Sequence, residues 1–204
     1  MAGEPLVGVL ALQGDFAEHA QALAAFGVAT RYVRRARDLV GLSGIVLPGG
    51  ESSTMLKLLA IQDLEAPLGE FLRSGRPVLA TCAGLILCAR KVVAPEQRSY
   101  GVLDIEVARN GWGRQIASGT FALAVRPGKE LPTTMSGVFI RAPRILGVGK
   151  GCEVLATRDG EAVLVRQGAV LGASFHPELE FRHPVMESFV RMLVQPHAQT
   201  ATSD

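Results

Sequence analysis

The chain has 204 residues, of which 48% are hydrophobic and 20% charged, and its formal net charge is only +2. This length suits one compact domain with a sizeable core, and the composition excludes an intrinsically disordered chain. The small net charge argues against nucleic acid binding. We therefore interpret the one basic cluster as a solvated edge or a protein contact; it consists of Arg31, Arg34, Arg35 and Arg37.

Cysteine spacing and apolar runs bear on the cellular compartment. Cys82, Cys88 and Cys152 are an odd number without C-x-x-C spacing, which argues against a disulfide framework and against a zinc site. Residues 6–12 form an apolar run without a preceding basic segment, which indicates a strand and not a secretory signal. No apolar run approaches the roughly 18 residues of a membrane span. We expect a cytoplasmic protein without a membrane partner.

Apolar runs in the first half predict strands that are buried on both faces. Each is followed by a glycine-bearing turn and then by a stretch with helical spacing, as in parallel strands joined by helices. The runs are residues 6–12, 44–47 and 77–81. We expect Gly27 to cap the C-terminus of the first helix, and Ser52-Ser53 to cap the N-terminus of the next one.

The second half consists of short apolar runs between Gly, Pro and Asp-Gly signals. The expected strands are residues 102–107, 121–125, 138–140, 154–156, 162–165 and 170–175. Asp159-Gly160 predicts a tight hairpin between two of them. A final helix over residues 184–194 is expected to complete a single domain of residues 1–194, and residues 195–204 are expected to be a disordered tail.

This order of elements predicts an α/β fold. Alternating strands and helices followed by hairpins are typical of a three-layer α/β/α domain with a mixed, mainly parallel central sheet of the flavodoxin-like kind. In open sheets of this class, sites lie beyond the carboxyl ends of the strands. Residues that directly follow the strands are therefore the candidates for function.

Cys82 lies between a strand and a helix, in T-C-A-G-L. At a helix N-terminus the dipole and the free N–H groups favour a thiolate over a thiol. The small residues Ala83 and Gly84 allow a close backbone approach, and we expect the Ala83 amide to face an oxyanion. The pattern resembles a nucleophile elbow with cysteine in place of serine. Taken alone, a free cysteine is more often a small buried hydrophobic residue, as we expect for Cys88 and Cys152.

His176 directly follows another strand, in S-F-H-P-E-L. Pro177 keeps His176 extended, so Glu178 points to the same side and its carboxylate can orient the imidazole. Taken alone, the pair also fits a satisfied histidine beside a surface glutamate. The cysteine elbow upstream favours a thiol triad instead. No catalytic role is assigned to the other three histidines, His19, His183 and His197.

A glycine turn, Gly49-Gly50, follows the strand at residues 44–47. Such a turn can present backbone N–H groups to an anion or a carbonyl oxygen, or it can be simple punctuation. The absence of G-K-[ST] and of G-x-G-x-x-G argues against nucleotide binding. Beside the cysteine strand in a parallel sheet, this turn is well placed to donate a second N–H to an oxyanion.

With these features in order, the sequence resembles the class I glutamine amidotransferases, and among them the family of glutaminase subunits of pyridoxal 5'-phosphate synthase. The likeness covers nearly the whole chain. The segments that carry it are V-L-A-L-Q-G from Val9, L-P-G-G-E-S-S-T-M from Leu47, T-C-A-G-L from Thr81, R-N at Arg109 with G-R-Q from Gly113, G-V-F-I-R-A-P from Gly137, and S-F-H-P-E-L from Ser174.

The resemblance implies a role for each matching residue. Cys82 is the implied nucleophile, with His176 and Glu178 completing the triad. The backbone of Gly50 and Ala83 is the implied oxyanion hole. The implied glutamine site consists of Gly50, Glu51, Ser52, Arg109, Ile140 and Arg141. A guanidinium suits a carboxylate, although without the resemblance a surface ion pair would be the simpler interpretation of both arginines.

The implied reaction is hydrolysis of L-glutamine to L-glutamate and ammonia. The ammonia passes to a separate synthase subunit, a lyase, that assembles pyridoxal 5'-phosphate from a pentose phosphate and a triose phosphate. We expect no metal or prosthetic group. We also expect activity to stay low until the synthase binds and orders the turn at residues 49–51.

Two alternatives remain open. The chain can be a glutaminase subunit of another ammonia-using synthase, such as that for imidazole glycerol phosphate, or a non-catalytic protein of this fold that uses its cysteine as a redox sensor. The sequence also departs from the family pattern in places that leave the triad intact and bear on contact with the partner. These are Ala80, residues 117–120 and residues 180–183.

Overall fold

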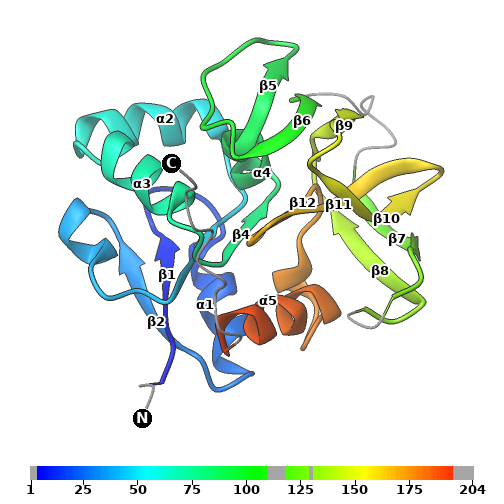
Figure 1. Ribbon diagram of the computed structural model, residues 1–204, viewed down its shortest axis with the longest axis horizontal. Coiled ribbons are helices and arrows are strands. Elements are labelled where there is room, and N and C mark those ends of the chain that lie inside the picture. The colour runs from blue at the N-terminus through cyan, green and yellow to red at the C-terminus, as the bar shows by residue number, and fades with distance from the viewer. Residues whose placement is uncertain (1–3, 110–117, 129–130, 195–204) are drawn as a thin grey trace, which may run out of the picture.

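A computed structural model describes residues 4–109, 118–128 and 131–194 (Figure 1). The described elements form a nine-stranded central sheet, a separate three-stranded sheet and helices on both faces of the central sheet. The predicted tail at residues 195–204 lies outside the described residues, as do Ala117 and the G-R-Q segment.

The central sheet has the strand order β2-β1-β3-β4-β12-β11-β10-β7-β8. The first five strands are parallel to one another, and each later neighbour is antiparallel. The parallel strands are β2 (Ala29–Val33), β1 (Leu6–Leu10), β3 (Gly44–Leu47), β4 (Val78–Thr81) and β12 (Val170–Ala173). The remaining four are β11 (Glu161–Gln167), β10 (Glu153–Arg158), β7 (Gly119–Val125) and β8 (Thr134–Phe139). The expected mixed sheet is confirmed.

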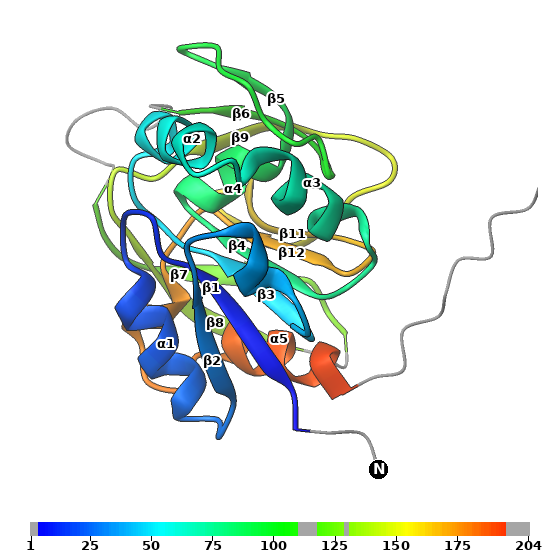
Figure 2. The same cartoon turned by 90° about the vertical axis from the view of Figure 1, so that its left-hand side faces the viewer.

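Helices cover both faces of the parallel strands (Figure 2). One face carries α1 (Phe16–Ala24) and α5 (Pro184–Val194). The other carries α2 (Ser52–Ile61), α3 (Glu65–Arg73) and α4 (Ala83–Cys88). Short 3-10 helices, η1 (Ala36–Leu39) and η2 (Pro177–Leu179), follow β2 and β12. This is the predicted three-layer arrangement.

Period-two alternation along the strands divides the apolar residues between two cores. In β3, Ile45 and Leu47 face the core beneath α2, α3 and α4, whereas Val46 faces the core beneath α1 and α5. Val78 and Leu79 of β4 divide in the same way. Strands with apolar residues on both faces must be covered on both sides, and this explains their unbroken apolar runs.

The second sheet was not anticipated from the sequence. It consists of β5 (Ala89–Val93), β6 (Leu103–Ala108) and β9 (Arg144–Val148), in the order β5-β6-β9. Its apolar residues join the core on the α4 side. The sheet brings the end of β6, and with it Arg109, toward the central sheet's carboxyl edge.

Other predictions differ from the structure in detail. Helix α1 has Ala25 as its C-cap residue, two positions before the predicted cap at Gly27. There, at φ 74°, Gly27 donates to the Ala24 carbonyl oxygen at 2.9 Å, and Val28 donates to that of Leu23 at 3.2 Å. These two bonds form a Schellman turn, which needs glycine at this position.

The structure also tests the predicted hairpin and the interpretation of the basic cluster. Asp159 and Gly160 have φ of 51° and 82° and join β10 to β11 as the expected hairpin. Of the basic cluster, Arg31 donates to the Val40 carbonyl oxygen at 2.7 Å and Arg34 to that of Ala11 at 3.3 Å, as expected of side chains at a sheet edge. No helix in the described ranges is both long and apolar enough to span a membrane.

Candidate active site

The turn at Cys82 is sharp and holds the side chain at the edge of a pocket. Strand β4 ends at Thr81 and α4 begins at Ala83, so Cys82 alone makes the turn, with φ 46° and ψ −102°. This is a strained conformation for a residue with a Cβ atom. The Cys82 amide donates to the Ala173 carbonyl oxygen at 2.9 Å, which ties the turn to β12.

Gly84 allows α4 to approach β3 closely. Its amide donates to the Pro48 carbonyl oxygen at 3.1 Å. A Cβ atom at this position would lie 2.7 Å from the carbonyl carbon of Leu47 and 2.8 Å from its Cβ. Only glycine fits against the backbone here, so the Ala-Gly pair after the cysteine has a steric cause.

The His176 and Glu178 side chains lie together as predicted, but Glu178 lies in the 3-10 helix η2 and not in an extended segment. The Nδ1 atom of His176 is 2.7 Å from Oε1 of Glu178. The His176 amide donates to the Val138 carbonyl oxygen at 2.8 Å, which fixes the backbone at the end of β12. Both side chains are buried, with 3% and 0% of their surface exposed.

The charges of this pair depend on each other and on the cysteine. Burial lowers the pKa of His176, but interactions with Cys82 and Glu178 outweigh it and raise the pKa to about 10. Burial likewise raises the pKa of Glu178, but His19 and His176 outweigh it, so the net shift is downward. The group therefore favours an ionised carboxylate and a charged imidazole beside Cys82.

A pocket of about 360 Å³ opens over these residues. The predicted site residues that line it are Gly50, Glu51, Ser52, Cys82, Arg109, Ile140, Arg141 and His176. The other two do not line it: Glu178 lies behind the imidazole, and Ala83 is fully buried. Sequence reasoning missed further lining residues, namely Gln13, Gly14, Asp15, Ile86 and Pro143. The segment Gln13–Asp15 follows β1 closely, so the rule that sites follow strands could have found it.

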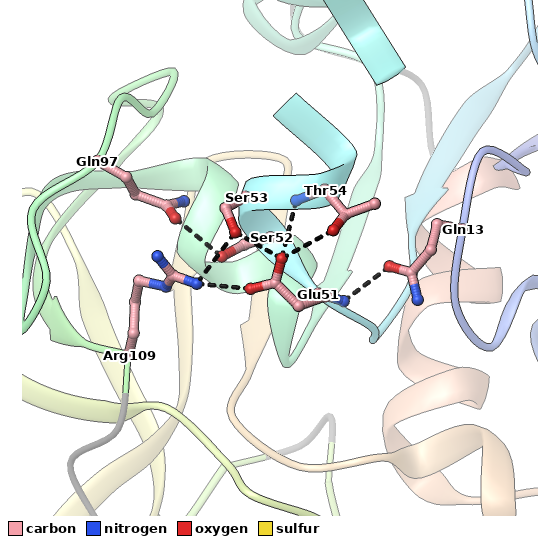
Figure 3. Close-up of polar contacts among 7 residues, drawn as sticks. All are labelled: Gln13, Glu51, Ser52, Ser53, Thr54, Gln97 and Arg109. Carbon is pink, nitrogen blue, oxygen red and sulfur yellow. Dashed lines mark hydrogen bonds and ion pairs between the residues drawn. The ribbon is translucent and has the colours of Figure 1, made fainter. Parts of the chain in front are cut away.

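Glu51 joins several parts of the pocket wall (Figure 3). Its Oε2 atom accepts from the Thr54 amide at 2.8 Å and from the Ser53 hydroxyl at 2.5 Å. Its Oε1 atom lies 2.6 Å from Nη2 of Arg109. Burial raises the pKa of Glu51, but these hydroxyl and amide donors and Arg109 outweigh it and lower the pKa to about 2. The N-cap of α2 is therefore Glu51, and the prediction of Ser52-Ser53 as the cap is wrong.

The glycine turn lies directly against His176. A Cβ atom at Gly49 would collide with Cε1 of His176 and would lie 2.8 Å from Oδ2 of Asp15. Gly50 has φ 141°, and the next amide, that of Glu51, donates to Oε1 of Gln13 at 2.7 Å. Strand β3 pairs in parallel with β4, so the turn lies beside the cysteine elbow as expected.

The two other cysteines lie outside the pocket lining. Cys88 and Cys152 are buried and form no disulfide, and burial raises their pKa values to about 12 and about 11. His183 is buried as well, with Nε2 2.9 Å from the Ser136 carbonyl oxygen. His19 lies in helix α1 and is fully buried, with its Nε2 atom 3.3 Å from Oε2 of Glu178.

Comparisons with known proteins agree over most of the chain. A model described as the SNO glutamine amidotransferase family matches residues 9–195. A protein of Koribacter versatilis named pyridoxal 5'-phosphate synthase subunit PdxT is 50% identical over 188 residues, covering 92% of this chain and 95% of that protein. A protein of the same name from Corynebacterium jeikeium is 47% identical over 193 residues, covering 93% and 97%. A crystal structure described as a glutamine amidotransferase has a TM-score of 0.84 and 43% identity, covering 92% of this chain and 98% of that one.

Proposed function

Since the chain belongs to the SNO glutamine amidotransferase family, we infer that it is the glutaminase subunit of a pyridoxal 5'-phosphate synthase. It hydrolyses L-glutamine to L-glutamate and ammonia. The observation that carries the catalytic assignment is the contact of His176 with the buried Glu178, because His176 lines the same pocket as Cys82 at its strained turn. The alternative of another synthase's glutaminase is less well supported, since both relatives carry the name of this one.

We propose that Cys82 is the nucleophile. Its thiolate attacks the side-chain amide carbon of glutamine, and the backbone N–H groups of Gly50 and Ala83 stabilise the oxyanion. His176 protonates the leaving nitrogen, so that ammonia departs and a thioester remains. The same histidine then takes a proton from water, which attacks the thioester and releases glutamate. Glu178 orients the imidazole and stabilises its charge throughout.

The charged lining of the pocket suits the main-chain end of an amino acid. Arg109 and Glu51 lie side by side as an ion pair, with Arg141 and Ile140 in the same lining. A substrate that carries a carboxylate next to an ammonium group can exchange partners with such a pair. We propose that Arg109 and Arg141 bind the α-carboxylate, that Glu51 binds the α-ammonium, and that Gly50, Ser52 and Ile140 complete the site.

We propose that the partner is the lyase subunit of the synthase and that it controls the glycine turn. The Glu51 amide donates its hydrogen bond to the Gln13 side chain, so this N–H group of the turn is not free to bind an oxyanion. Rearrangement of residues 49–51 on binding would couple ammonia release to a partner that can use it. Phe181 is 86% exposed, comes three residues after Glu178 and lies in the segment that departs from the family pattern, which makes it a candidate contact.

We also propose that residues 1–194 act as one domain in the cytoplasm. The pocket takes residues from Gln13 to His176, so both halves of the chain are needed to build it. The three cysteines are free, which suits a reducing compartment.

The test is a glutaminase assay on the wild-type chain, with and without the synthase subunit. Cys82→Ala should abolish ammonia release while the fold is kept, and Cys88→Ala, a buried cysteine outside the pocket, should retain it. Hydrolysis by the Cys82→Ala variant would refute the nucleophile. Equal rates with and without the synthase would refute the coupling, and stimulation only by a different ammonia-using synthase would refute the proposed partner.

A further inference from the structure

We propose that His19 is a positioning residue of the triad: its Nε2–H group holds the second oxygen of Glu178 and links it to Thr81, next to the nucleophile. This inference rests on the proposed function, because it assigns a role within the same site. His19 lies on α1, on the opposite face of the central sheet from α4, and lines no part of the pocket.

Distances place His19 between the two halves of the triad. Its Nε2 atom is 2.9 Å from Oγ1 of Thr81 and 3.3 Å from Oε2 of Glu178. Thr81 is the last residue of β4, and Glu178 lies in η2, just after β12. These two strands are parallel neighbours in the sheet. One imidazole therefore spans the ends of the strands that carry the nucleophile and the His–Glu pair.

Glu178 needs this donor. Its side chain is fully buried, and Oε1 is occupied by His176 at 2.7 Å. Oε2 makes no hydrogen bond within the described part of the chain, and Nε2 of His19 lies 3.3 Å from it as an electrostatic contact. A buried carboxylate oxygen is stable only with a donor nearby, and the Nε2 atom of His19 is the side-chain nitrogen in reach.

The surroundings of His19 determine which nitrogen carries its proton. Burial lowers the pKa of His19, and Glu178 raises it less than burial lowers it, so the ring is neutral near pH 7. The other charged groups that act on it are His176, Asp15 and Glu18. The Nδ1 atom is buried without a hydrogen-bond partner among the described residues. The single proton therefore lies on Nε2, because a lone pair there would face the carboxylate.

The proposed hydrogen bond from His19 to Oε2 has a consequence for catalysis. A donor to Oε2 favours the ionised form of Glu178 and keeps its Oε1 atom directed at His176. Without the donor, the carboxylate is free to turn and takes up a proton at higher pH. The imidazole then loses its orienting charge. We therefore expect His19 to affect the rate of the chemical step and its pH dependence, and not the binding of glutamine.

The experiment compares three variants as full chains in complex with the synthase. His19→Leu removes the donor, His19→Gln places an amide N–H near the position of Nε2, and His183→Gln is a control at another buried histidine. We expect His19→Leu to lower kcat roughly tenfold with an unchanged KM for glutamine, and to move the acid limb of the kcat–pH profile up by about one unit. His19→Gln should have a kcat and an acid limb close to those of the wild type, and His183→Gln should change neither the kcat nor the acid limb.

Each outcome decides the proposal. An acid limb that stays in place in His19→Leu, or equal losses in His19→Leu and His19→Gln, would overturn it. If His19→Leu does not fold, His19→Asn replaces it, since its shorter amide does not reach Oε2; equal pH profiles for the Asn and Gln variants would also overturn the proposal. Failure of the proposed function is distinguishable, because the wild-type complex would then lack Cys82-dependent ammonia release.

Discussion

Gly84→Ala tests whether the close approach of α4 to β3 sets the position of Cys82, the proposed nucleophile. On helix propensity alone, this change should stabilise α4 by about 1 kcal/mol. The structure predicts the opposite sign. The new Cβ atom would lie 2.7 Å from the carbonyl carbon of Leu47 and closer still to its oxygen, whereas ordinary contact begins at 3.4 Å. The two backbones must therefore separate by more than about 0.7 Å.

The cost of this separation can be estimated. β3 is held between β1 and β4, so α4 has to move, and the 3.1 Å bond from the Gly84 amide to Pro48 is lost. Overpacking costs about 1–3 kcal/mol and the hydrogen bond about 1 kcal/mol. After the propensity gain, a net destabilisation of about 1–3 kcal/mol is expected. Cys82 moves with the helix, and a shift approaching 1 Å at a reacting atom lowers kcat by roughly 100-fold.

The assays are urea unfolding of the free subunit and the glutaminase rate of the complex. Gly147→Ala in β9 is the matched control, because its nearest neighbour would be Cβ of Glu106 at 4.0 Å. That variant should keep wild-type stability and activity. If Gly84→Ala is more stable than the wild type and retains its kcat, the steric argument for the elbow is wrong.

Two further predictions concern the acidic residues of the site. Glu178→Gln should lower kcat by roughly 10³–10⁴-fold with the fold intact, because an amide no longer stabilises the charged imidazole; a rate within tenfold of the wild type would contradict this. Glu51 has its pKa lowered from 4.5 to about 2, so its carboxylate contributes stability that is present above pH 4.5 and is lost as the pH falls toward 2. The wild type should therefore unfold at a higher urea concentration than Glu51→Gln at about pH 6, and this difference should become smaller as the pH is lowered to about 3. A difference that does not change with pH would argue against the carboxylate as the cause.

Local patterns in the sequence predicted most strands of the central sheet, the elbow and the His–Glu pair, but not β2. Unbroken apolar runs give strands that are buried on both faces, and such strands place the residues that follow them at one edge of a sheet. Cys82, His176 and the glycine turn could be found in this way because each follows such a strand. The contact between His176 and Glu178 was also predicted from their closeness in the sequence, although the chain reaches it through a 3-10 turn and not through an extended segment.

Other features depend on contacts between residues far apart in the sequence. In the sequence, Glu51 resembles an ordinary surface residue. In the structure, it accepts a hydrogen bond from the first turn of α2 and pairs with Arg109, which follows β6. The three-stranded sheet that ends next to Arg109 also depends on packing, because Arg90 and Lys91 interrupt the apolar pattern of β5. Such strands are hard to predict from sequence patterns, since strand propensity is weak compared with tertiary contacts.

His19 shows the same limit most clearly. In the sequence it is a polar residue of an amphipathic helix, and such residues usually face solvent. The sheet instead buries it completely, between Thr81 and Glu178. The sequence alone determined the three residues of the proposed triad, because their backbone neighbours are local. Only the tertiary structure decided what surrounds them, because burial and long-range contacts arise when α1, β4 and β12 pack together.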